Sequence, residues 1–322
     1  MLTSSEGRRG SYRQLRRTQP SFPVGEYSLC VGSQYRKLSR NQRLMNAQRI
    51  KTHLISIIGA QATARVQALR FAYLLKTKKR VPDPEVQLLG GFIGRGDVAV
   101  DIGANGADWT YHIYGFTGAS GRIFAFEADP YYALATDLAI GILRLKGVQL
   151  FSFGLSSVDE EVPLRVGDSS GLRFAGLGYV DKSVSCSDKS VVAVPMKRLD
   201  SMLSEYPELW ATKLIKCDVE GYELFVMQGA SKLLAKARPV VILEVGNFER
   251  HGYSAQDVQG FFKKQQYCSF AMTDCNALSE TDASMDHPSA MSVNRVLLPE
   301  EKLDSIGSSI DISRLTISRA CV

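Results

Sequence analysis

The chain has 322 residues, of which 45% are hydrophobic and 22% are charged, and its formal net charge is +6. This apolar fraction is typical of a globular protein and excludes a disordered chain, while the absence of about 18 consecutive uncharged apolar residues argues against a membrane-spanning helix. We expect a soluble protein with one large domain or two small ones.

The positive charge is concentrated at the start of the chain. Residues 1–80 contain 17 lysines and arginines against two acids, a net charge of +15, whereas residues 81–322 carry a net charge of −9. Such a basic arm can bind nucleic acid, an anionic membrane surface or an acidic partner. The alternative is a solvated helical extension that packs on the body of the protein.

Targeting and redox signals are weak. The first 20 residues are polar and rich in arginine, without the apolar core of a secretory signal, so we expect a cytoplasmic protein, with organellar import left open. The six cysteines form no CxxC pair and no zinc-ligand spacing, which predicts free thiols and no metal site.

The N-terminal pattern predicts helices and then a break. Apolar residues recur at helical spacing from residue 41, and a second helix is predicted over residues 60–76. Pro82 and Pro84 interrupt the chain where the charge changes sign, which predicts a domain boundary near residue 82. We therefore expect a basic, partly helical extension (residues 1–82), a main domain (83–300) and a C-terminal tail (301–322).

The main domain alternates apolar runs with helical segments. Strands are predicted over residues 98–100, 123–126, 148–151, 214–217 and 240–243, and helices over residues 107–116, 131–145, 222–234 and 255–264. This order predicts an α/β fold with a Rossmann-like, doubly wound parallel sheet. Residues 267–272 and 292–297 predict an antiparallel hairpin at the sheet edge, and residues 162–194 a hairpin excursion with a Gly/Ser-rich tip.

Acidic residues follow several of these strands. Asp101, Glu127, Asp218 and Glu244 each end an apolar run, and ligands in open α/β sheets bind beyond the carboxyl ends of the strands. The glycine-rich turn after Asp101 allows close approach to a ligand. The Glu127 carboxylate can accept both hydroxyls of a ribose, so the pattern favours a nucleoside-containing cofactor.

The turn after the first strand narrows the choice of cofactor. The G-x-G-x-x-G pattern of nicotinamide sites is incomplete, because Asp101 stands where the first glycine would be, and a Walker-type loop is also missing. A carboxylate at this position can offset an ammonium or a sulfonium group. S-adenosylmethionine carries both.

Six segments carry a family resemblance. They are VAVDIGANGADWT (98–110), IFAFEADP (123–130), FSFGLSS (151–157), VPMKRLDSML (194–203), LIKCDVEGYELFVMQGA (214–230) and RPVVILEV (238–245). With these segments the stretch from about Val98 to Val296, roughly 200 residues, resembles the FkbM family of S-adenosylmethionine-dependent methyltransferases. The most specific run, at residues 216–223, is Lys-x-Asp-Val-Glu-Gly-x-Glu. The basic arm lies outside the resemblance.

The resemblance implies roles for individual residues. The implied cofactor-binding set is Asp101, Gly103, Ala104, Asn105, Glu127, Phe153, Gly154, Leu155 and Asp218. In this set residues 101–105 form the cofactor loop, Glu127 binds the ribose, and residues 153–155 border the adenine. Asp218, Glu220 and Gly221 match the acidic motif beside the transferred methyl group. The chain departs from the family's D-x-G-A-N-x-G pattern at Ala107, which replaces the final glycine.

The resemblance favours an O-methyltransferase that acts on a hydroxyl of a sugar, glycan or polyketide-type metabolite. A hydroxyl acceptor requires a group that removes its proton, for which the candidates are Glu220 and Glu244, with His251 in reserve and Asp218 orienting the reactants. Two alternatives remain open: an RNA methyltransferase that uses the basic arm, and a non-catalytic cofactor-binding interaction protein.

Overall fold

The computed structural model describes residues 59–168, 173, 177–185, 187–272, 278–280 and 293–309. The chain divides into the units Met1–Ser39 and Arg40–Val322, and all described residues belong to the second unit. The helix predicted from residue 41 lies outside them. Within the described part of the chain, no helix is long and apolar enough to cross a membrane.

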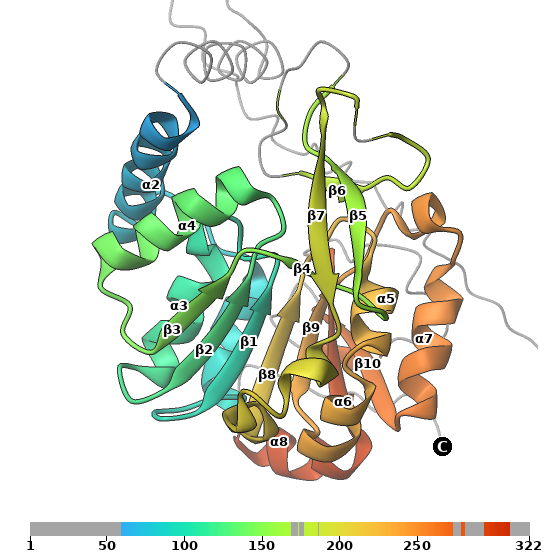
Figure 1. Ribbon diagram of the computed structural model, residues 1–322. Helices are drawn as coiled ribbons and strands as arrows, with labels where there is room; N and C mark the ends of the chain where they lie inside the picture. Colours follow the sequence, from blue (N-terminus) through green and yellow to red (C-terminus); the bar gives the residue numbers. More distant parts are fainter. Residues whose placement is uncertain are drawn as a thin grey trace, which may run out of the picture. The chain divides into compact units, whose positions relative to one another are not determined.

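An eight-stranded sheet forms the centre of the fold (Figure 1). Its order is β11-β10-β12-β9-β8-β1-β2-β3. The parallel strands are β1 (Val98–Ile102), β2 (Arg122–Phe126), β3 (Val148–Phe151), β8 (Thr212–Cys217) and β9 (Val240–Glu244). The strand order reverses between β1 and β8, as in a doubly wound sheet, and the predicted α/β fold is confirmed.

The C-terminal strands refine the predicted edge hairpin. β10 (Tyr267–Met272) and β12 (Asn294–Pro299) pair antiparallel, as predicted, but β12 lies inside the sheet between β9 and β10. The edge is formed instead by β11 (Leu278–Glu280), which the sequence analysis did not predict. All residues of β12 are buried, which is why its sequence lacks a polar face.

Helices cover both faces of the sheet. They are α2 (Ala60–Lys76), α3 (Asp108–Thr117), α4 (Pro130–Leu143), α5 (Glu223–Gln228), α6 (Ser231–Ala237), α7 (Ala255–Lys264) and α8 (Leu303–Ser309). The helix predicted over residues 222–234 is split into α5 and α6 at Gly229. A side chain there would lie 1.9 Å from the carbonyl oxygen of Ser156, so the chain requires glycine at this close approach.

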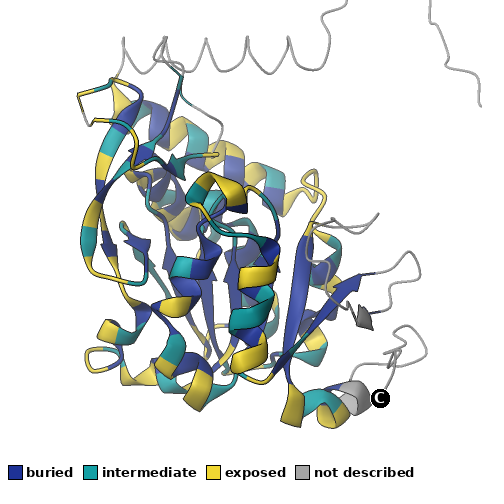
Figure 2. Ribbon diagram, turned by 90° about the vertical axis from the view of Figure 1, so that its right-hand side faces the viewer, coloured by how far each residue is buried: buried dark blue, intermediate teal, exposed yellow. Residues whose placement is uncertain are grey.

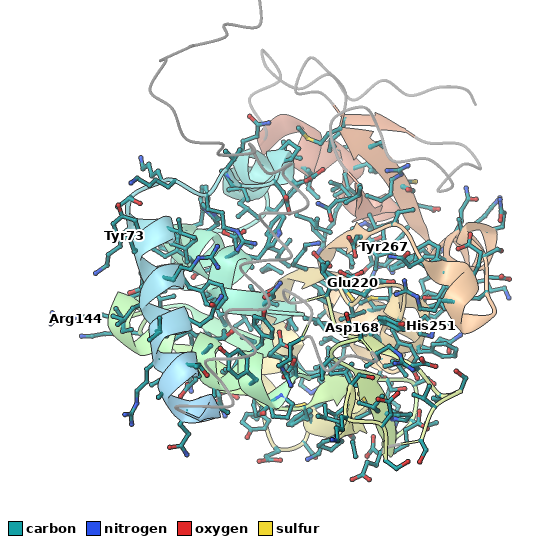
Figure 3. The ribbon with its side chains drawn as sticks, turned by 90° about the horizontal axis from the view of Figure 1, so that it is seen from above. Tyr73, Arg144, Asp168, Glu220, His251 and Tyr267 are labelled. Atoms are coloured by element: carbon teal, nitrogen blue, oxygen red, sulfur yellow. The ribbon has the colours of Figure 1, made fainter. Side chains whose placement is uncertain are left out.

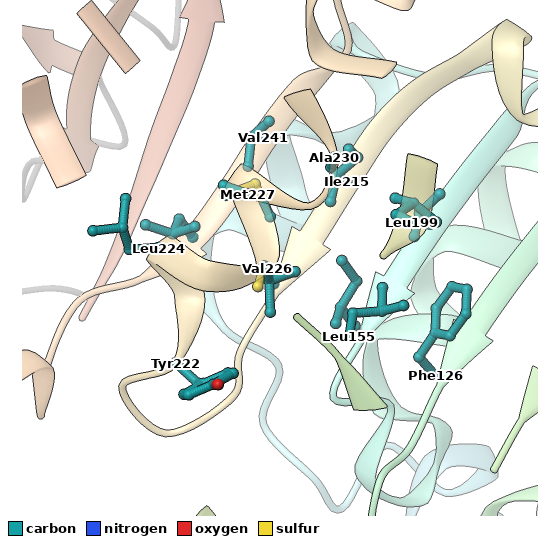
Figure 4. Packing of buried hydrophobic residues seen from close by; sticks show 14 of the residues in the cluster. Phe126, Leu155, Leu199, Ile215, Tyr222, Leu224, Val226, Met227, Ala230 and Val241 are labelled. Atoms are coloured by element: carbon teal, nitrogen blue, oxygen red, sulfur yellow. The ribbon is translucent and has the colours of Figure 1, made fainter. Parts of the chain in front are cut away.

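The alternation along the strands divides the core into two layers. Val241 and Leu243 of β9 pack with α5, α6 and α7, whereas Val240 and Ile242 pack with α3, α8 and the 3-10 helix η1 (Pro84–Gly91). Figure 4 shows the first layer, in which residues of the α5–α6 segment pack with the strands: Tyr222, Leu224, Val226, Met227 and Ala230. Figure 2 shows the central strands buried and the outer helix faces exposed.

A second, four-stranded sheet contains the predicted excursion. Its order is β4 (Gly154–Leu155), β7 (Val191–Lys197), β5 (Glu160–Arg165) and β6 (Tyr179–Val180). β5 and β7 form the predicted antiparallel pair, with Val162 opposite Val194. In Figure 1 its strands β5, β6 and β7 rise above the large sheet, on the side where α4 begins.

Helix α2 packs on α4. Ala64, Ala68 and Phe71 form a buried cluster with Tyr132 and Ala135, and the rings of Phe71 and Tyr132 are 6.4 Å apart. This part of the N-terminal extension therefore lies on the body of the protein, as in the second interpretation of the basic arm. The boundary near residue 82 stays a prediction that truncation can test.

Candidate active site

A cleft of about 280 Å³ opens at the carboxyl ends of β1, β2, β8 and β9. Figure 3 looks onto this end of the molecule, with Glu220 near the middle of the view. The predicted site residues that line the cleft are Gly103, Ala104, Asn105, Glu127, Phe153, Gly154, Leu155, Asp218, Glu220 and Glu244. The structure thus brings together residues that lie more than 140 positions apart in the sequence.

The loop after β1 is fixed by its neighbours. The N–H groups of Gly103 and Ala104 both donate to the carbonyl oxygen of Phe126, at 2.9 Å. Gly103 has φ +86°, and a side chain there would lie 1.9 Å from the carbonyl oxygen of Asp218. The loop can therefore lie between the ends of β2 and β8 only because this residue is glycine.

The departure from the family pattern has a local structural consequence. Ala107, which replaces the family's final glycine, is buried and adopts a left-handed conformation with φ +64°. An alanine in this region costs about 1–2 kcal/mol, so glycine would be the less strained residue here. Gly106 also has a positive φ, and the Phe71 ring of α2 lies against it, leaving no room for a side chain.

Glu127 lies at the end of β2 and is held by the main chain. Its Oε2 accepts from the N–H of Asn105 at 3.0 Å, and its Oε1 from the N–H of Asp129 at 2.9 Å. Burial raises the pKa of Glu127 to about 7. A carboxylate offers about four lone-pair positions, so two remain for hydroxyls of a ligand in the cleft.

One wall of the cleft beside Glu127 is apolar. Phe153, Leu155, Phe126 and Met196 contribute side chains to it. A side chain at Gly154 would lie 2.3 Å from the Met196 sulfur, so glycine allows the backbone to approach this wall. An apolar surface beside a carboxylate with acceptor positions left for a ligand fits a nucleoside, whose base would lie on the apolar wall.

Three carboxylates form the opposite end of the cleft. Single oxygens of Asp218, Glu220 and Glu244 lie within 4.8 Å of one another, a geometry that could also hold a divalent cation. Burial and the neighbouring Asp218 raise the pKa of Glu244 to about 9. Burial, followed by Asp218, also raises the pKa of Glu220. Burial of these carboxylates and the repulsion between their charges therefore favour protonation of the cluster.

Lys216 supports the acidic cluster from within the sheet. Its Nζ is buried, donates to Asn294 Oδ1 at 2.8 Å and lies 3.5 Å from Asp218 Oδ2. The Asn294 amide in turn donates to Glu85 at 3.1 Å. Within the family-specific run at 216–223, the positive charge of Lys216 thus compensates the negative charge of Asp218.

The loop that carries Glu220 is held by Glu223. Glu223 Oε1 accepts from the N–H groups of Val219 and Gly221, at 3.0 and 3.3 Å. The Tyr253 hydroxyl donates to the Gly221 carbonyl. Glu220 itself has φ +57°, an uncommon conformation for glutamate that these bonds maintain.

Two predicted residues lie outside the cleft wall. Asp101 is fully buried under the loop, accepts a hydrogen bond from Thr110, and has a pKa raised to about 6 by burial. His251 lines a neighbouring cavity instead. Their predicted roles, direct cofactor contact and reserve base, stay predictions.

The connector between α2 and η1 also contributes to the cleft, together with Trp109 of α3. Arg80, Asp83 and Trp109 all line the cleft. Arg80 Nε lies 2.6 Å from Asp108 Oδ2, and the Trp109 indole donates to Asp83 at 2.9 Å. The connector lies at the predicted domain boundary and outside the family resemblance, so no sequence pattern pointed to these contacts.

A family model for the Methyltransferase FkbM domain matches residues 101–269, which is more than half of the chain. The chain belongs to the FkbM methyltransferase family. This confirms the resemblance found in the sequence and, with it, S-adenosylmethionine as the cofactor. The matched segment contains every predicted site residue, including the loop after β1 and the acidic run at 216–223. No curated protein matches the sequence.

Several solved structures are similar to the chain. They include the methyltransferase FkbM from Methylobacillus flagellatus KT, with 12% identity and a TM-score of 0.45, over 76% of this chain and 60% of that one. A SAM-dependent methyltransferase from Aquifex aeolicus has 11% identity and a TM-score of 0.38, over 70% and 97%. The chain thus spans less than two thirds of the Methylobacillus protein, and the FkbM assignment rests on the family model.

Proposed function

We propose that this FkbM-family protein transfers a methyl group from S-adenosylmethionine to a hydroxyl oxygen of a sugar, glycan or polyketide-type acceptor. The observation that carries the proposal is a single cleft with two chemically different ends. One end has a hydroxyl-binding carboxylate beside an apolar wall, and the other has three acids at the ends of β8 and β9.

The cleft residues fit the cofactor part by part. Glu127 would accept the ribose hydroxyls, and Phe153 and Leu155 would flank the adenine. Asp218, whose side chain is half-buried, would offset the positive charge of the methionine portion. When bound, the cofactor supplies an electrophilic methyl group on a sulfonium sulfur. The protein's main contribution is then to align that group with the acceptor oxygen.

Glu220 is our proposed general base. A carboxylic acid with a pKa of about 9 is mostly protonated near neutral pH, so Glu244 would donate a hydrogen bond to Asp218 rather than accept a proton. Glu220 is half-buried in the cleft wall, and the charge of Arg250 counteracts part of the rise in its pKa. Arg250 thus favours the ionised form of Glu220, which is the form that accepts the proton of an acceptor hydroxyl.

The acidic cluster would also attract the positively charged cofactor more than the neutral product. This preference stabilises the bound ground state and by itself does not accelerate transfer. The rate must come from alignment and from proton removal, and these two contributions can be separated by measuring turnover and cofactor affinity in the same variants.

The test combines binding with transfer of label. Calorimetric titration with S-adenosylhomocysteine should show binding, and tritiated S-adenosylmethionine should label a sugar, glycan or polyketide fraction of a cell extract. Label in the RNA fraction would favour the RNA alternative. Binding without transfer to any fraction would favour the non-catalytic alternative, and both outcomes would overturn the proposal.

A further inference from the structure

A second cavity, of about 270 Å³, adjoins the cofactor cleft. Val180 and Tyr222 line both spaces, so the two share a wall. The remaining wall comes from residues 181–183, which follow β6, and from Phe225 of α5. Arg250 and His251 of the 3-10 helix η5 (Phe248–His251) complete it. His251, labelled in Figure 3, lies on the same end of the molecule as Glu220. The second cavity is thus placed next to the end of the cleft where the acceptor hydroxyl would react.

Arg250 presents a fixed positive charge to this cavity. Its guanidinium lies 4.0 Å above the ring of Tyr179, which is itself a cleft residue. Its Nη1 donates to the carbonyl oxygen of Glu220 at 3.3 Å, and its Nη2 to Asn247 Oδ1 at 3.5 Å. Both acceptors are neutral and both bonds are long. Among the described residues, no carboxylate lies within 4.0 Å of this guanidinium.

The other polar groups of the cavity also favour an anion. Lys182 brings a second cation, which Glu160 holds at 2.9 Å. The acid in the wall, Asp181, is engaged by Arg165 at 2.8 Å and by the N–H of Ser183 at 3.1 Å. The Nε2 atom of His251 is buried without a hydrogen-bond partner in the described structure. The wall therefore offers a guanidinium whose charge acts on Glu220 but which no carboxylate of the described residues contacts directly. It also offers an imidazole nitrogen without a hydrogen-bond partner in the described structure.

We propose that the second cavity binds an anionic group of the methyl acceptor, a phosphate or a carboxylate, with Arg250 as its principal partner. The acceptor's hydroxyl would lie at Glu220 in the adjoining cleft. The guanidinium suits this role because its planar set of N–H groups can bind two oxygens of a phosphate or carboxylate at once. The inference rests on the proposed function, since it names the chemical class of acceptor for the same site.

Contacts of Arg250 link the cofactor cleft to the second cavity. Arg250 contacts the main chain of Glu220, and its ring partner Tyr179 precedes Val180 in the shared wall. An acceptor with its anionic group on Arg250 would therefore be anchored beside the proposed base. Arg250 would then select acceptors that carry an anionic group, without itself taking part in proton transfer.

The test uses three probes on the protein saturated with S-adenosylhomocysteine. Glucose 6-phosphate, glucuronate and glucose are titrated by calorimetry, and we expect at least one anionic probe to bind ~10-fold or more tightly than glucose. The tighter of the two identifies the group as phosphate or carboxylate. Arg250→Ala should abolish the preference, and Arg250→Lys should restore part of it, because it retains the charge and loses the planar fork.

Arg198→Ala is the matched control, because Arg198 is an exposed arginine near Asp159 and lines neither space. It should leave the preference unchanged. The inference is overturned if neither anionic probe binds more tightly than glucose, or if Arg250→Ala retains the preference. Loss of S-adenosylhomocysteine binding in the wild-type protein would instead contradict the proposed function, so the two failures are distinguishable.

Discussion

Two glutamates at opposite ends of the cleft, the buried Glu127 and the half-buried Glu244, show how differently one fold can treat the same side chain. Burial raises the pKa of both, to about 7 for Glu127 and about 9 for Glu244. Glu127 is surrounded by main-chain N–H donors, whereas Glu244 meets a second carboxylate, Asp218. The N–H donors around Glu127 favour its ionised form, which accepts hydrogen bonds, whereas the neighbouring Asp218 favours the protonated form of Glu244.

The comparison predicts its largest effect at the acidic end. Glu220→Gln should lower turnover by about 10²–10⁴-fold while cofactor affinity stays nearly unchanged, because the amide keeps the shape of the side chain but cannot accept a proton. The measurement is methyl transfer together with calorimetric titration of S-adenosylmethionine.

Glu249→Gln, at an exposed glutamate in η5, is the control for this prediction and should turn over normally. Glu244→Gln should retain more activity than Glu220→Gln if Glu244 is protonated in the working enzyme. If both amides turn over at the wild-type rate and His251→Ala does not, the imidazole is the base and the carboxylates have a structural role.

Helix α2 lies outside the family match, but its Phe71 packs against the loop at the cofactor end. Phe71→Ala should lower the free energy of unfolding by about 3–5 kcal/mol, because it opens a cavity between α2, α4 and the loop at Gly106. Leu69→Ala, on the exposed face of the same helix, should change it by less than about 0.5 kcal/mol. Urea unfolding of both variants makes the comparison.

The predicted domain boundary near residue 82 can be tested with a shortened chain. A chain that starts there lacks α2 and Arg80, which pairs with Asp108 beside the cleft. If this shortened chain binds S-adenosylhomocysteine as tightly as the full chain, α2 is dispensable for the cofactor end. The contacts of Phe71 would then serve stability alone.

At the cofactor end itself, Glu127→Ala should weaken S-adenosylmethionine binding about ten- to hundredfold. Removing the carboxylate leaves polar groups of ligand and loop unpaired, at about 1–3 kcal/mol. Calorimetric titration measures the effect, and Asp137→Ala, at an exposed acid on α4, is the control. Unchanged affinity in Glu127→Ala would contradict the assignment of Glu127 to the ribose.

The last prediction concerns the dependence of stability on pH. The pKa of Glu244 rises from 4.5 to about 9 on folding, so the folded state binds more protons than the unfolded state between these values, and stability falls as pH rises. Glu244→Gln removes this loss. Its melting temperature relative to wild type should therefore increase between about pH 5 and about pH 9.

Glu301, whose pKa is lowered and not raised on folding, provides the control for this measurement. The pKa of Glu301 is lowered to about 2 by its hydrogen bonds from Arg238, so Glu301 stabilises the fold above pH 4.5 and loses this contribution as pH falls. Glu301→Gln should be slightly less stable than wild type at neutral pH, and the difference should shrink in acid. Equal pH profiles for wild type and Glu244→Gln would contradict the raised pKa of Glu244.

Local sequence patterns determined most of the secondary structure and one edge of the site. The segments 60–76, 148–151, 255–264 and 267–272 were predicted with the bounds that the structure has, because buried strands and amphipathic helices differ in the period of their apolar residues. Acids at the strand ends predicted a common site, since parallel strands place their carboxyl ends at one edge. The family resemblance, most specific at residues 216–223, predicted S-adenosylmethionine as the cofactor.

Tertiary structure decided what these residues face. In the sequence Asp101 and Glu127 both end an apolar run, yet Asp101 lies within β1 and is covered by the loop, whereas Glu127 follows β2 and lines the cleft. The Lys216–Asn294 hydrogen bond joins residues 78 positions apart. The Arg250 guanidinium of η5 is positioned over the ring of Tyr179, which belongs to the four-stranded sheet. Such contacts have no period along the chain, because they depend on strand order and on which helix covers which face. The sequence by itself therefore determined the elements and the cofactor, and only packing determined the pKa of Glu244, the role of α2 and the second cavity.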